Sequence, residues 1–265
     1  MLKLNDITYS YTEASKTLDN ISFAIDGGTI VAIAGRNGSG KTTLSRLIMG
    51  LLQPSIGTIN LGDQDVTSFS APDMAKYIGY VFQNPDQQLF QNTVLAEALY
   101  APERLGFSHS DALNNAKSAL RAVGLEEYSD QMPQALAKGM KQRLAIASAL
   151  AAKPQILILD EPTSGQDCRE RTVMLRLMRS LNEQGLTIII VTHDMDIIAE
   201  HADQLLVLAD GKLEFDGEPK ELFADEQRTV ELGLELPEAV RISKEMGIGI
   251  CLTPYEIYSK MAKEV

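Results

Sequence analysis

The sequence is poor in the residues that build disulfide scaffolds, metal sites and nucleic-acid-binding surfaces. It contains no tryptophan, three histidines and two cysteines, and its 24 lysines and arginines are outnumbered by 36 aspartates and glutamates. Cys168 and Cys251 have no metal-ligand spacing and indicate no disulfide framework. The formal net charge of −12 disfavours a protein whose main task is to bind the phosphate backbone of nucleic acid.

Long apolar runs are also absent. The longest ones, such as TIIIV and ILIL, are far shorter than the roughly 20 residues of a membrane-spanning helix. The N-terminal segment MLKLNDITYSY has no basic region followed by an apolar one, as a signal peptide would. These observations predict a protein of the reducing cytosol, and 265 residues suffice for one large domain with a small appendage.

What the sequence does contain is a set of short apolar segments without polar alternation. Strands that are buried on both faces of a parallel sheet have this composition, whereas half-exposed strands alternate. The segments therefore predict an α/β fold with a mostly parallel sheet. They are TIVAIAG at 29–35, YIGYVF at 77–82, QILILDEP at 155–162, LTIIIVTH at 186–193 and DQLLVLAD at 203–210.

Helical patterns lie between these segments. Residues 110–124 and 170–185 carry apolar side chains at helical spacing. Ser110 is in position to cap the first of these helices. Gly124 and Gly185 are in position to end the first and the second helix, respectively.

The distribution of strands and helices indicates the domain organisation. The stretch from about 86 to 150 contains no convincing strand, so it is predicted to be a helical subdomain inserted into one domain of residues 1–225. The segment LADGKLEFDG predicts a β-hairpin that turns at Asp210-Gly211. Beyond about 225 the pattern changes to short helices, and residues 226–265 are predicted to form a small C-terminal helical extension.

The segment GRNGSGKTT, called the phosphate loop from here on, follows the first predicted strand and precedes the helical LSRLIMGLL. It fits the nucleotide-binding pattern G-x-x-x-x-G-K-[ST]. Glycines let backbone N–H groups curl around an anion, and the helix N-terminus adds a favourable dipole. Lys41 is expected to reach the β- and γ-phosphates, Thr42 to join Mg²⁺, and Thr43 to contact the α-phosphate. The predicted nucleotide-binding residues of the loop are Gly35, Asn37, Gly38, Ser39, Gly40, Lys41, Thr42 and Thr43.

Two carboxylates directly follow the apolar run ILIL. Asp160 is predicted to hold the metal ion, directly or through water. Glu161, one residue later and on the opposite side of the chain, is predicted to polarise the attacking water. The tripeptide DEP is a weak signal by itself, but together with the phosphate loop it indicates hydrolysis of a nucleotide.

Together these motifs resemble those of the ATP-binding cassette (ABC) ATPases, and the resemblance extends to about residue 220. It implies a P-loop NTPase core with a mostly parallel sheet, an antiparallel β subdomain, the helical insertion and the small C-terminal extension. It also implies that ATP and Mg²⁺ are the ligands.

The resemblance assigns roles to four further residues. Tyr11 is similar to the aromatic residue that stacks on adenine, and Gln83 to the glutamine that meets Mg²⁺ and couples the site to the helical insertion. His193 matches the switch histidine that contacts the γ-phosphate. Asp167 matches the loop that crosses to the other subunit, although Gln166 replaces the usual leucine or alanine. The plain alternatives are an edge-strand tyrosine, a loop amide and a capped strand-end histidine.

Two segments, FQNPDQQLFQNTV and VELGLELPEAVRISKEMG, resemble the ATPase subunits of energy-coupling-factor importers, which take up vitamins and transition-metal ions. The resemblance implies three partners: a second ABC ATPase, a transmembrane scaffold subunit and a membrane substrate-binding subunit. It places Asn84–Val94 in the groove that receives coupling helices from the scaffold, the alternative being a solvated helix start. The chain would then act at the cytoplasmic face of the cell membrane, held there by its partners.

The helix expected to start at AKGMKQR has no side chain that caps its N–H groups. The resemblance aligns Leu136–Met140 with the family's signature, Leu-Ser-Gly-Gly-Gln, which acts on the γ-phosphate held by the other subunit. Ala137 lacks the hydroxyl, Lys138 replaces a glycine, Met140 replaces an amide, and Gly139 is retained. Lys138 can still reach a phosphate as a point charge. We therefore expect this chain to pair with a different ABC ATPase whose signature is intact.

The leading hypothesis is thus the ATP-hydrolysing subunit of a membrane importer, and the neighbouring one is the ATPase of another ABC transporter class, such as an exporter. A nucleic-acid-associated ABC ATPase is disfavoured because no coiled-coil, zinc-binding or basic insertion is visible. A subunit that binds ATP but hydrolyses little is disfavoured by the intact Glu161 and His193.

Overall fold

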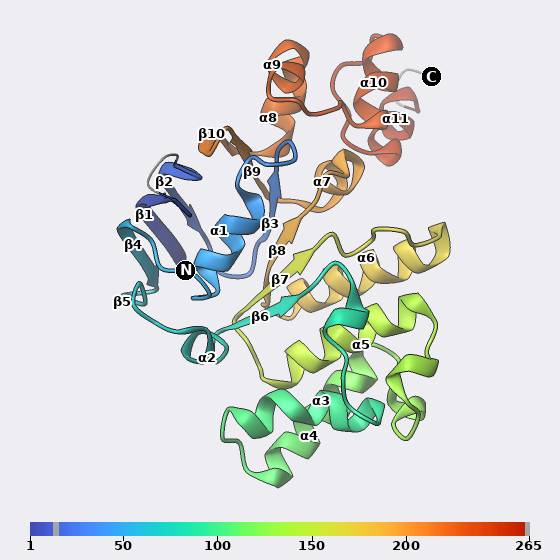
Figure 1. Ribbon diagram of the computed structural model, residues 1–265. Coiled ribbons are helices and arrows are strands. Elements are labelled where there is room, and N and C mark those ends of the chain that lie inside the picture. The colour runs from blue at the N-terminus through green and yellow to red at the C-terminus, as the bar shows by residue number, and fades with distance from the viewer. Residues whose placement is uncertain (13–15, 263–265) are drawn as a thin grey trace. The chain divides into compact units, whose positions relative to one another are not determined.

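The computed structural model describes residues 1–12 and 16–262 and is shown in Figure 1. The described chain forms two compact units. The first comprises residues 1–47, 53–67 and 191–265, and the second comprises residues 48–52 and 68–190.

The first unit contains a four-stranded antiparallel sheet. Its strand order is β2 (Leu18–Ile25), β1 (Leu2–Tyr9), β4 (Ile56–Leu61) and β5 (Gln64–Asp65). Leu4 pairs with Phe23 on one side and with Ile59 on the other, and all three side chains are buried. This sheet is the antiparallel β subdomain that the family resemblance implied.

The first unit also contains the strand that leads into the phosphate loop. This strand, β3 (Ile30–Ala34), is buried over its whole length and pairs in parallel with β9 (Gln204–Ala209). Strand β9 then pairs antiparallel with β10 (Lys212–Gly217). The turn between β9 and β10 has positive φ at Asp210 (47°) and Gly211 (76°), which confirms the predicted hairpin.

Five helices complete the first unit after β8. They are α7 (Met195–His201), α8 (Pro219–Ala224), α9 (Glu226–Glu231), α10 (Glu238–Glu245) and α11 (Pro254–Met261). Figure 1 shows α10 and α11 near the C-terminal end of the chain. Leu234 and Val240 of the C-terminal extension belong to the same buried cluster as Ala32 and Ala34 of β3 and Phe223 of α8. The extension therefore shares its core with the strand that leads into the phosphate loop.

The second unit contains the remaining predicted strands. Strand β7 (Ile156–Asp160) lies between β6 (Ile78–Val81) and β8 (Thr187–Val191), and β6 and β7 pair in parallel. All five segments predicted as strands from their apolar composition are strands, so the predicted α/β class is confirmed. Helix α1 (Lys41–Ile48) connects the phosphate loop of the first unit to this unit, where α2 (Ala71–Met74) precedes β6.

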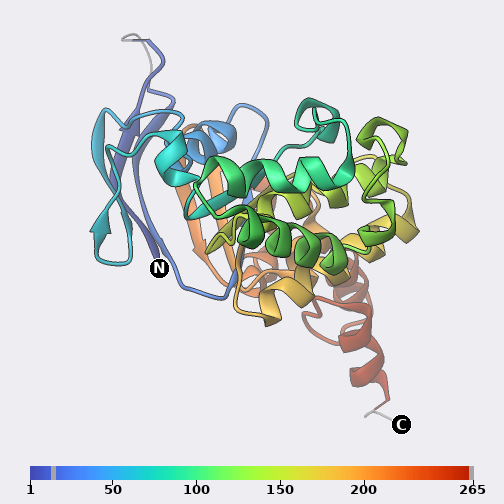
Figure 2. The same cartoon turned by 90° about the horizontal axis from the view of Figure 1, so that it is seen from below.

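Residues 86–150, all of which the structure describes, contain helices and no strand. Their role as a separate helical subdomain stays a prediction. Helices α3 (Val94–Arg104), α4 (His109–Ala122) and α5 (Lys138–Ala151) lie side by side in Figures 1 and 2. The 3₁₀ turn η1 (Pro85–Gln87) precedes α3, and the 3₁₀ turns η2 (Glu126–Tyr128) and η3 (Pro133–Ala135) lie between α4 and α5. Helix α6 (Cys168–Glu183) follows β7.

The predicted helix ends are partly wrong. The N-cap of α4 is Ser108, whose hydroxyl accepts a hydrogen bond from the Asp111 N–H at 3.1 Å, and not Ser110. Ser108 has the extended backbone that an N-cap requires, whereas Ser110 lies inside the first helical turn. Gly124 (φ 70°) and Gly185 (φ 93°) follow α4 and α6 in the left-handed conformation, as predicted.

None of the helices in residues 1–12 and 16–262 combines the length and the apolar character needed to cross a membrane.

Candidate functional site

The phosphate loop connects β3 to α1 in the first unit and depends on its glycines. Gly35 has φ 140°, and a Cβ at this position would overlap the Leu208 carbonyl oxygen. Gly40 has φ 105°, and a Cβ there would lie 2.5 Å from Leu18 Cδ2. The loop conformation therefore excludes side chains at both positions.

The phosphate loop contains several hydrogen-bond donors. Lys41 Nζ donates to the carbonyl oxygens of Gly35 at 2.7 Å and Arg36 at 3.0 Å. The Ser39 hydroxyl is buried and has no hydrogen-bond partner among the described residues. Thr42 and Thr43 lie in the first turn of α1, where the backbone N–H groups have no partner within the helix. A cation, a buried hydroxyl and a helix N-terminus in one loop fit a bound phosphate chain.

Tyr11 lies beside the phosphate loop. Its hydroxyl is 3.4 Å from the Thr43 hydroxyl and accepts a hydrogen bond from Arg46 Nη1 at 3.4 Å. The Thr43 hydroxyl lowers the pKa of the Tyr11 phenol most strongly, burial opposes it, and the Arg46 guanidinium adds to the lowering. The ring contacts Tyr9 edge-on and is 53% exposed, so it leaves an open aromatic surface next to the loop.

His193 follows β8 in a tight turn of the first unit. The Thr192 N–H donates to the Ile33 carbonyl oxygen of β3 at 3.2 Å, which fixes the turn beside the strand that leads into the phosphate loop. The Asp194 N–H donates to the Thr192 hydroxyl at 3.1 Å, and the Asp194 carboxylate caps α7. His193 itself is exposed at this edge. The role of His193 as the switch histidine stays a prediction.

Of the residues predicted to act on the metal ion and the attacking water, Gln83, Asp160 and Glu161 lie in the second unit, and Thr42 lies in the first. Asp160 ends β7, and its Oδ2 accepts a hydrogen bond from the Tyr80 hydroxyl of β6 at 2.9 Å. Gln83 is exposed just beyond β6, at the same edge of the parallel pair. Glu161 has φ 47°, a left-handed conformation that costs a non-glycine residue about 1–2 kcal/mol. Such strain is typical of residues held in place for function.

The degenerate signature begins α5, as predicted, and Ala137 provides no side-chain cap. Lys138 Nζ donates to the carbonyl oxygens of Ser164 at 3.2 Å and Gly165 at 3.3 Å. A Cβ on Gly139 would overlap the Glu170 side chain, which would have to move to make room for it. The sequence motifs did not indicate either contact, because both join α5 to the loop and helix that follow β7.

Asp167 has a role within its own subunit. It is the N-cap of α6, and its Oδ1 accepts a hydrogen bond from the Glu170 N–H at 2.9 Å. The predicted crossing of this loop to another subunit stays a prediction. Gln166, which stands where the family resemblance expects leucine or alanine, donates from Nε2 to the Pro162 carbonyl oxygen at 3.0 Å.

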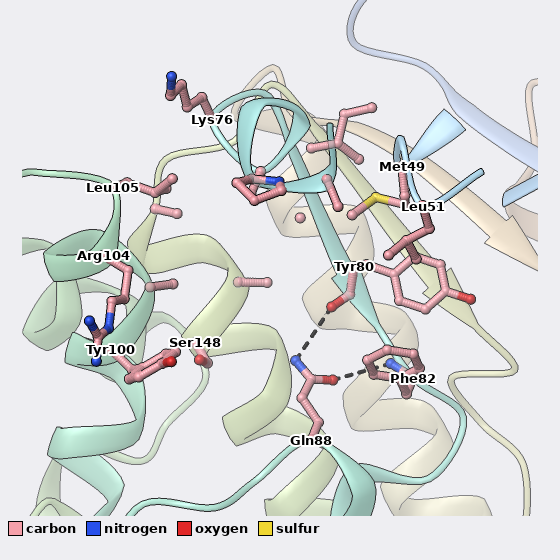
Figure 3. Close-up of a pocket in the computed structure, with 18 of the residues that line it drawn as sticks. Met49, Leu51, Lys76, Tyr80, Phe82, Gln88, Tyr100, Arg104, Leu105 and Ser148 are labelled. Atoms are coloured by element: carbon pink, nitrogen blue, oxygen red, sulfur yellow. Dashed lines mark hydrogen bonds between the residues drawn. The ribbon is translucent and has the colours of Figure 1, made fainter. Parts of the chain in front are cut away.

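A cavity of about 630 Å³ lies within the second unit, and we call it the coupling groove. Figure 3 shows Tyr100 and Arg104 of α3 on one side of it and Phe82 and Gln88 on another. Gln88 fixes the chain at the groove because its Oε1 accepts from the Phe82 N–H at 3.2 Å and its Nε2 donates to the Tyr80 carbonyl oxygen at 3.4 Å.

The segment between Asn84 and Val94 contributes one large exposed side chain to this groove. Phe90 is 58% exposed and meets the Tyr100 ring edge-on at 4.8 Å between centroids. The Arg104 guanidinium lies 5.3 Å from the centroid of the same Tyr100 ring. Leu89 is 7% exposed and belongs to the core, so Leu89 and Phe90 are not equivalent surface positions.

Glu97 is a buried carboxylate at the groove that sequence reasoning missed. It is 2% exposed, and its Oε2 accepts hydrogen bonds from the N–H groups of Phe90 and Gln91, both at 2.8 Å. Burial raises the pKa of the Glu97 carboxyl, and these two hydrogen bonds partly offset the effect. No sequence motif indicated its burial, because a glutamate is ordinarily exposed.

We expect Glu97→Ala to lower the free energy of unfolding by about 1–3 kcal/mol, because two backbone N–H groups lose their acceptor. Glu97→Gln retains an oxygen that accepts both hydrogen bonds, so its loss at neutral pH is expected to be clearly smaller. Urea unfolding of the three proteins tests this. A glutamine variant as unstable as the alanine variant would contradict the acceptor role.

The same unfolding experiment at several pH values tests the raised pKa. Because the folded-state pKa of Glu97 lies above its unfolded value, its contribution to stability is fully present below the unfolded pKa and is lost as the pH rises through the folded pKa. The free energy of unfolding of the wild-type protein is therefore expected to rise relative to that of Glu97→Gln as the pH falls from above the folded-state pKa to below the unfolded-state pKa.

The sequence is similar to the ATP-binding subunits of transporters. The sequence profile of the family described as ABC transporter matches residues 18–164, more than half of the chain. An ABC transporter ATP-binding protein of Pyrococcus horikoshii is 41% identical over 248 residues, 94% of each chain. The energy-coupling factor transporter ATP-binding protein EcfA of Methanococcus maripaludis is 37% identical over 256 residues, 94% of this chain and 92% of EcfA. An ABC transporter ATP-binding protein of Caldanaerobacter subterraneus is 40% identical over 247 residues, but the chain spans 43% of its length.

The chain is also similar to solved structures of ATP-binding cassettes. CbiO1 from Clostridium perfringens, described as part of the ABC transporter complex CbiONQ, is 33% identical to this chain with a TM-score of 0.80. The similarity covers 93% of this chain and 98% of CbiO1. A dimeric ATP-binding cassette in a post-hydrolysis state, bound to ADP and Pi, has a TM-score of 0.72 and 28% identity, covering 83% of this chain and 99% of the other.

Proposed function

This chain belongs to the ABC transporter ATP-binding family, and we propose from that premise that it powers a membrane importer of the energy-coupling-factor type. As a member of the family it is an ATPase subunit whose ATP hydrolysis is coupled to transport. ATP binding is carried by the phosphate loop, where Lys41, the buried Ser39 hydroxyl and the start of α1 form a donor set for a phosphate chain.

The proposed roles of the residues follow from their chemistry. The phosphate loop, Gly35–Thr43, binds the phosphates of ATP, and the exposed ring of Tyr11 stacks on adenine. Glu161 orients and polarises the attacking water, and His193 contacts the γ-phosphate.

We propose the Thr42 hydroxyl, the Gln83 amide and the Asp160 carboxylate as oxygen ligands of Mg²⁺, as the family resemblance implies. The set fits Mg²⁺, which prefers oxygen ligands and binds through one or two carboxylates together with substrate phosphates. When bound, Mg²⁺ neutralises charge on the β- and γ-phosphates. Asp160 is held for this role by the Tyr80 hydroxyl.

The coupling groove supports the proposed membrane partner. Its lining is mostly apolar, with the exposed Phe90 and Tyr100 rings at a mouth that suits a helix from a transmembrane scaffold subunit. Through this scaffold the chain acts at the cytoplasmic face of the membrane. The assembly also contains a second ABC ATPase and a membrane substrate-binding subunit.

The energy-coupling-factor type is supported by the similarity to EcfA and CbiO1 over most of the chain. The transported substrate is then a vitamin or a transition-metal ion. The alternative is the ATPase of another ABC transporter class, because the relatives also include ATP-binding proteins without that designation. The net charge of −12 disfavours a nucleic-acid-associated ABC ATPase.

Co-purification of the chain from detergent-solubilised membranes tests the proposal. We expect one small membrane scaffold, one substrate-binding subunit and one other ABC ATPase in the isolated complex. Recovery of the chain with an exporter, or with nucleic acid and no membrane protein, would overturn it.

Phe90→Glu is expected to uncouple transport from ATP hydrolysis, because it puts a charge on the apolar mouth of the coupling groove. Loss of a central aromatic contact typically costs 2 kcal/mol or more, roughly a 30-fold loss of affinity for the partner helix. ATP binding by the isolated chain is expected to stay unchanged. Transport and scaffold co-purification are the measurements.

Met132→Glu is the matched control, since Met132 is also 58% exposed in the helical insertion but does not line the groove. Leu89, which lies in the same sequence segment as Phe90, is unsuitable because a charge there would disrupt the core. Equal transport by the Phe90 and Met132 variants would remove the support for this groove as the docking site.

A further inference from the structure

The turn after α9 contacts the phosphate loop within the first unit. Gly233 has φ 75°, its N–H donates to the Val230 carbonyl oxygen at 2.9 Å, and the next N–H, of Leu234, donates to the Thr229 carbonyl oxygen at 3.1 Å. A Cβ on Gly233 would overlap the side chain of Arg36, with Nε as the nearest atom. The second residue of the phosphate loop therefore lies directly against this turn.

Arg36 in turn holds the loop. Its carbonyl oxygen accepts hydrogen bonds from Lys41 Nζ at 3.0 Å and from the Ser39 N–H at 3.1 Å. A displacement of the Arg36 side chain that reaches its backbone moves an acceptor of Lys41 Nζ, the lysine that is assigned to the phosphates. The contact with Gly233 thus lies one residue away from the nucleotide-binding groups.

The turn has a fixed position relative to the strand before the loop. Leu234, next to Gly233, and Val240 of α10 are buried in one cluster with Ala34, the residue before Gly35. The start of α10 is attached to α7, since the Glu238 N–H donates to the Asp196 carboxylate at 2.7 Å. The C-terminal extension is therefore built into the support of the phosphate loop.

We propose that the Gly233 turn packs against the Arg36 side chain and holds it in place. Through this contact, the C-terminal extension sets the position of Lys41 and the affinity of the chain for nucleotide. Arg36 and Gly233 are positioning residues. A partner or movement that displaces α9 and α10 changes nucleotide affinity through this contact. The proposal rests on the proposed assignment of Lys41 to the phosphates.

Gly233→Ala tests the contact between the turn and Arg36, and Gly247→Ala is its matched control. Gly247 follows α10 with φ 69° and has the same hydrogen-bond pattern as Gly233. Its N–H donates to the Lys244 carbonyl oxygen, and the next N–H, of Ile248, donates to the Ser243 carbonyl oxygen. A Cβ on Gly247 would meet nothing within 4 Å. The two variants therefore share the backbone strain and differ in the overlap with Arg36.

The measurement is titration of the full chain with a fluorescent ATP analogue and Mg²⁺, together with thermal unfolding. We expect Gly233→Ala to weaken nucleotide binding roughly tenfold, as loss of one charge-assisted hydrogen bond does. Gly247→Ala is expected to change it less than about twofold at a similar loss of stability. Equal effects on binding would overturn the proposal.

The test is completed by titrating Arg36→Ala with and without the additional change Gly233→Ala. With Arg36 shortened, the added effect of Gly233→Ala is expected to fall below about twofold, because no side chain remains to be displaced. An undiminished effect would overturn the proposal. Lys41→Ala separates this outcome from failure of the proposed function, since unchanged binding in that variant means that the phosphate site itself is wrongly assigned.

Discussion

Replacing Glu161 by glutamine is expected to lower ATP turnover of the assembled transporter by about 10²–10⁴-fold while ATP still binds. The substitution keeps the shape of the side chain and removes the carboxylate that is proposed to polarise the attacking water. A long-lived closed state with ATP is the expected product. Lys41→Ala acts at the earlier step, because loss of a charge-assisted hydrogen bond weakens nucleotide binding by about 1.5–3 kcal/mol, or 10–100-fold.

Asp210→Asn is the matched control for Glu161→Gln. Both residues are acidic, and both have φ 47°, but Asp210 lies in the turn between β9 and β10. The control therefore reproduces the change from acid to amide in a left-handed backbone without touching the proposed site. Unchanged turnover in Glu161→Gln, or an equal loss in Asp210→Asn, would contradict the proposed role of Glu161.

The second large effect concerns the degenerate signature. In the proposed heterodimer, this chain's phosphate loop faces the intact signature of the other ABC ATPase, while that subunit's nucleotide faces Ala137 and Lys138. A missing donor at a developing phosphate charge costs about 2.7–4 kcal/mol, or 10²–10³ in rate. Lys138 is a poor substitute, because its Nζ already donates to the carbonyl oxygens of Ser164 and Gly165. We therefore expect the two sites to hydrolyse ATP at unequal rates.

The test compares Lys41→Ala with the matching lysine change in the other ABC ATPase. We expect the change in this chain to remove nearly all ATP hydrolysis by the complex and the change in the partner to remove little. Equal losses would contradict the asymmetric arrangement. So would a purified homodimer of this chain that hydrolyses ATP at the full rate of the transporter.

Ala137→Ser and Lys138→Gly together probe the same asymmetry from the opposite side. They restore the hydroxyl and the close approach that the family signature provides, and they release the carbonyl oxygens of Ser164 and Gly165. Hydrolysis at the partner's nucleotide is expected to rise. Arg121→Gly in the exposed helix α4 controls for loss of a cation and gain of a glycine within the helical insertion.

The amino-acid sequence by itself determined the features that depend on local chemistry. The buried strands and the phosphate loop could be predicted because apolar composition, helical spacing and glycine content act over a few residues. The hairpin at Asp210-Gly211 is of this kind, since both residues tolerate positive φ. The prediction of Ser110 as the cap was wrong, because Ser108 has the same side chain and only the backbone conformation separates the two serines.

Only the tertiary structure decided which side chains meet. Leu89 and Phe90 are adjacent and both apolar, yet packing buries the first and exposes the second. The partners of Lys138 lie beyond the following strand, and Arg36 meets a turn near the other end of the chain. Such contacts join residues that are far apart in sequence, so no local pattern encodes them. Each depends on how the strands and helices pack, which is the step that a sequence pattern leaves undetermined.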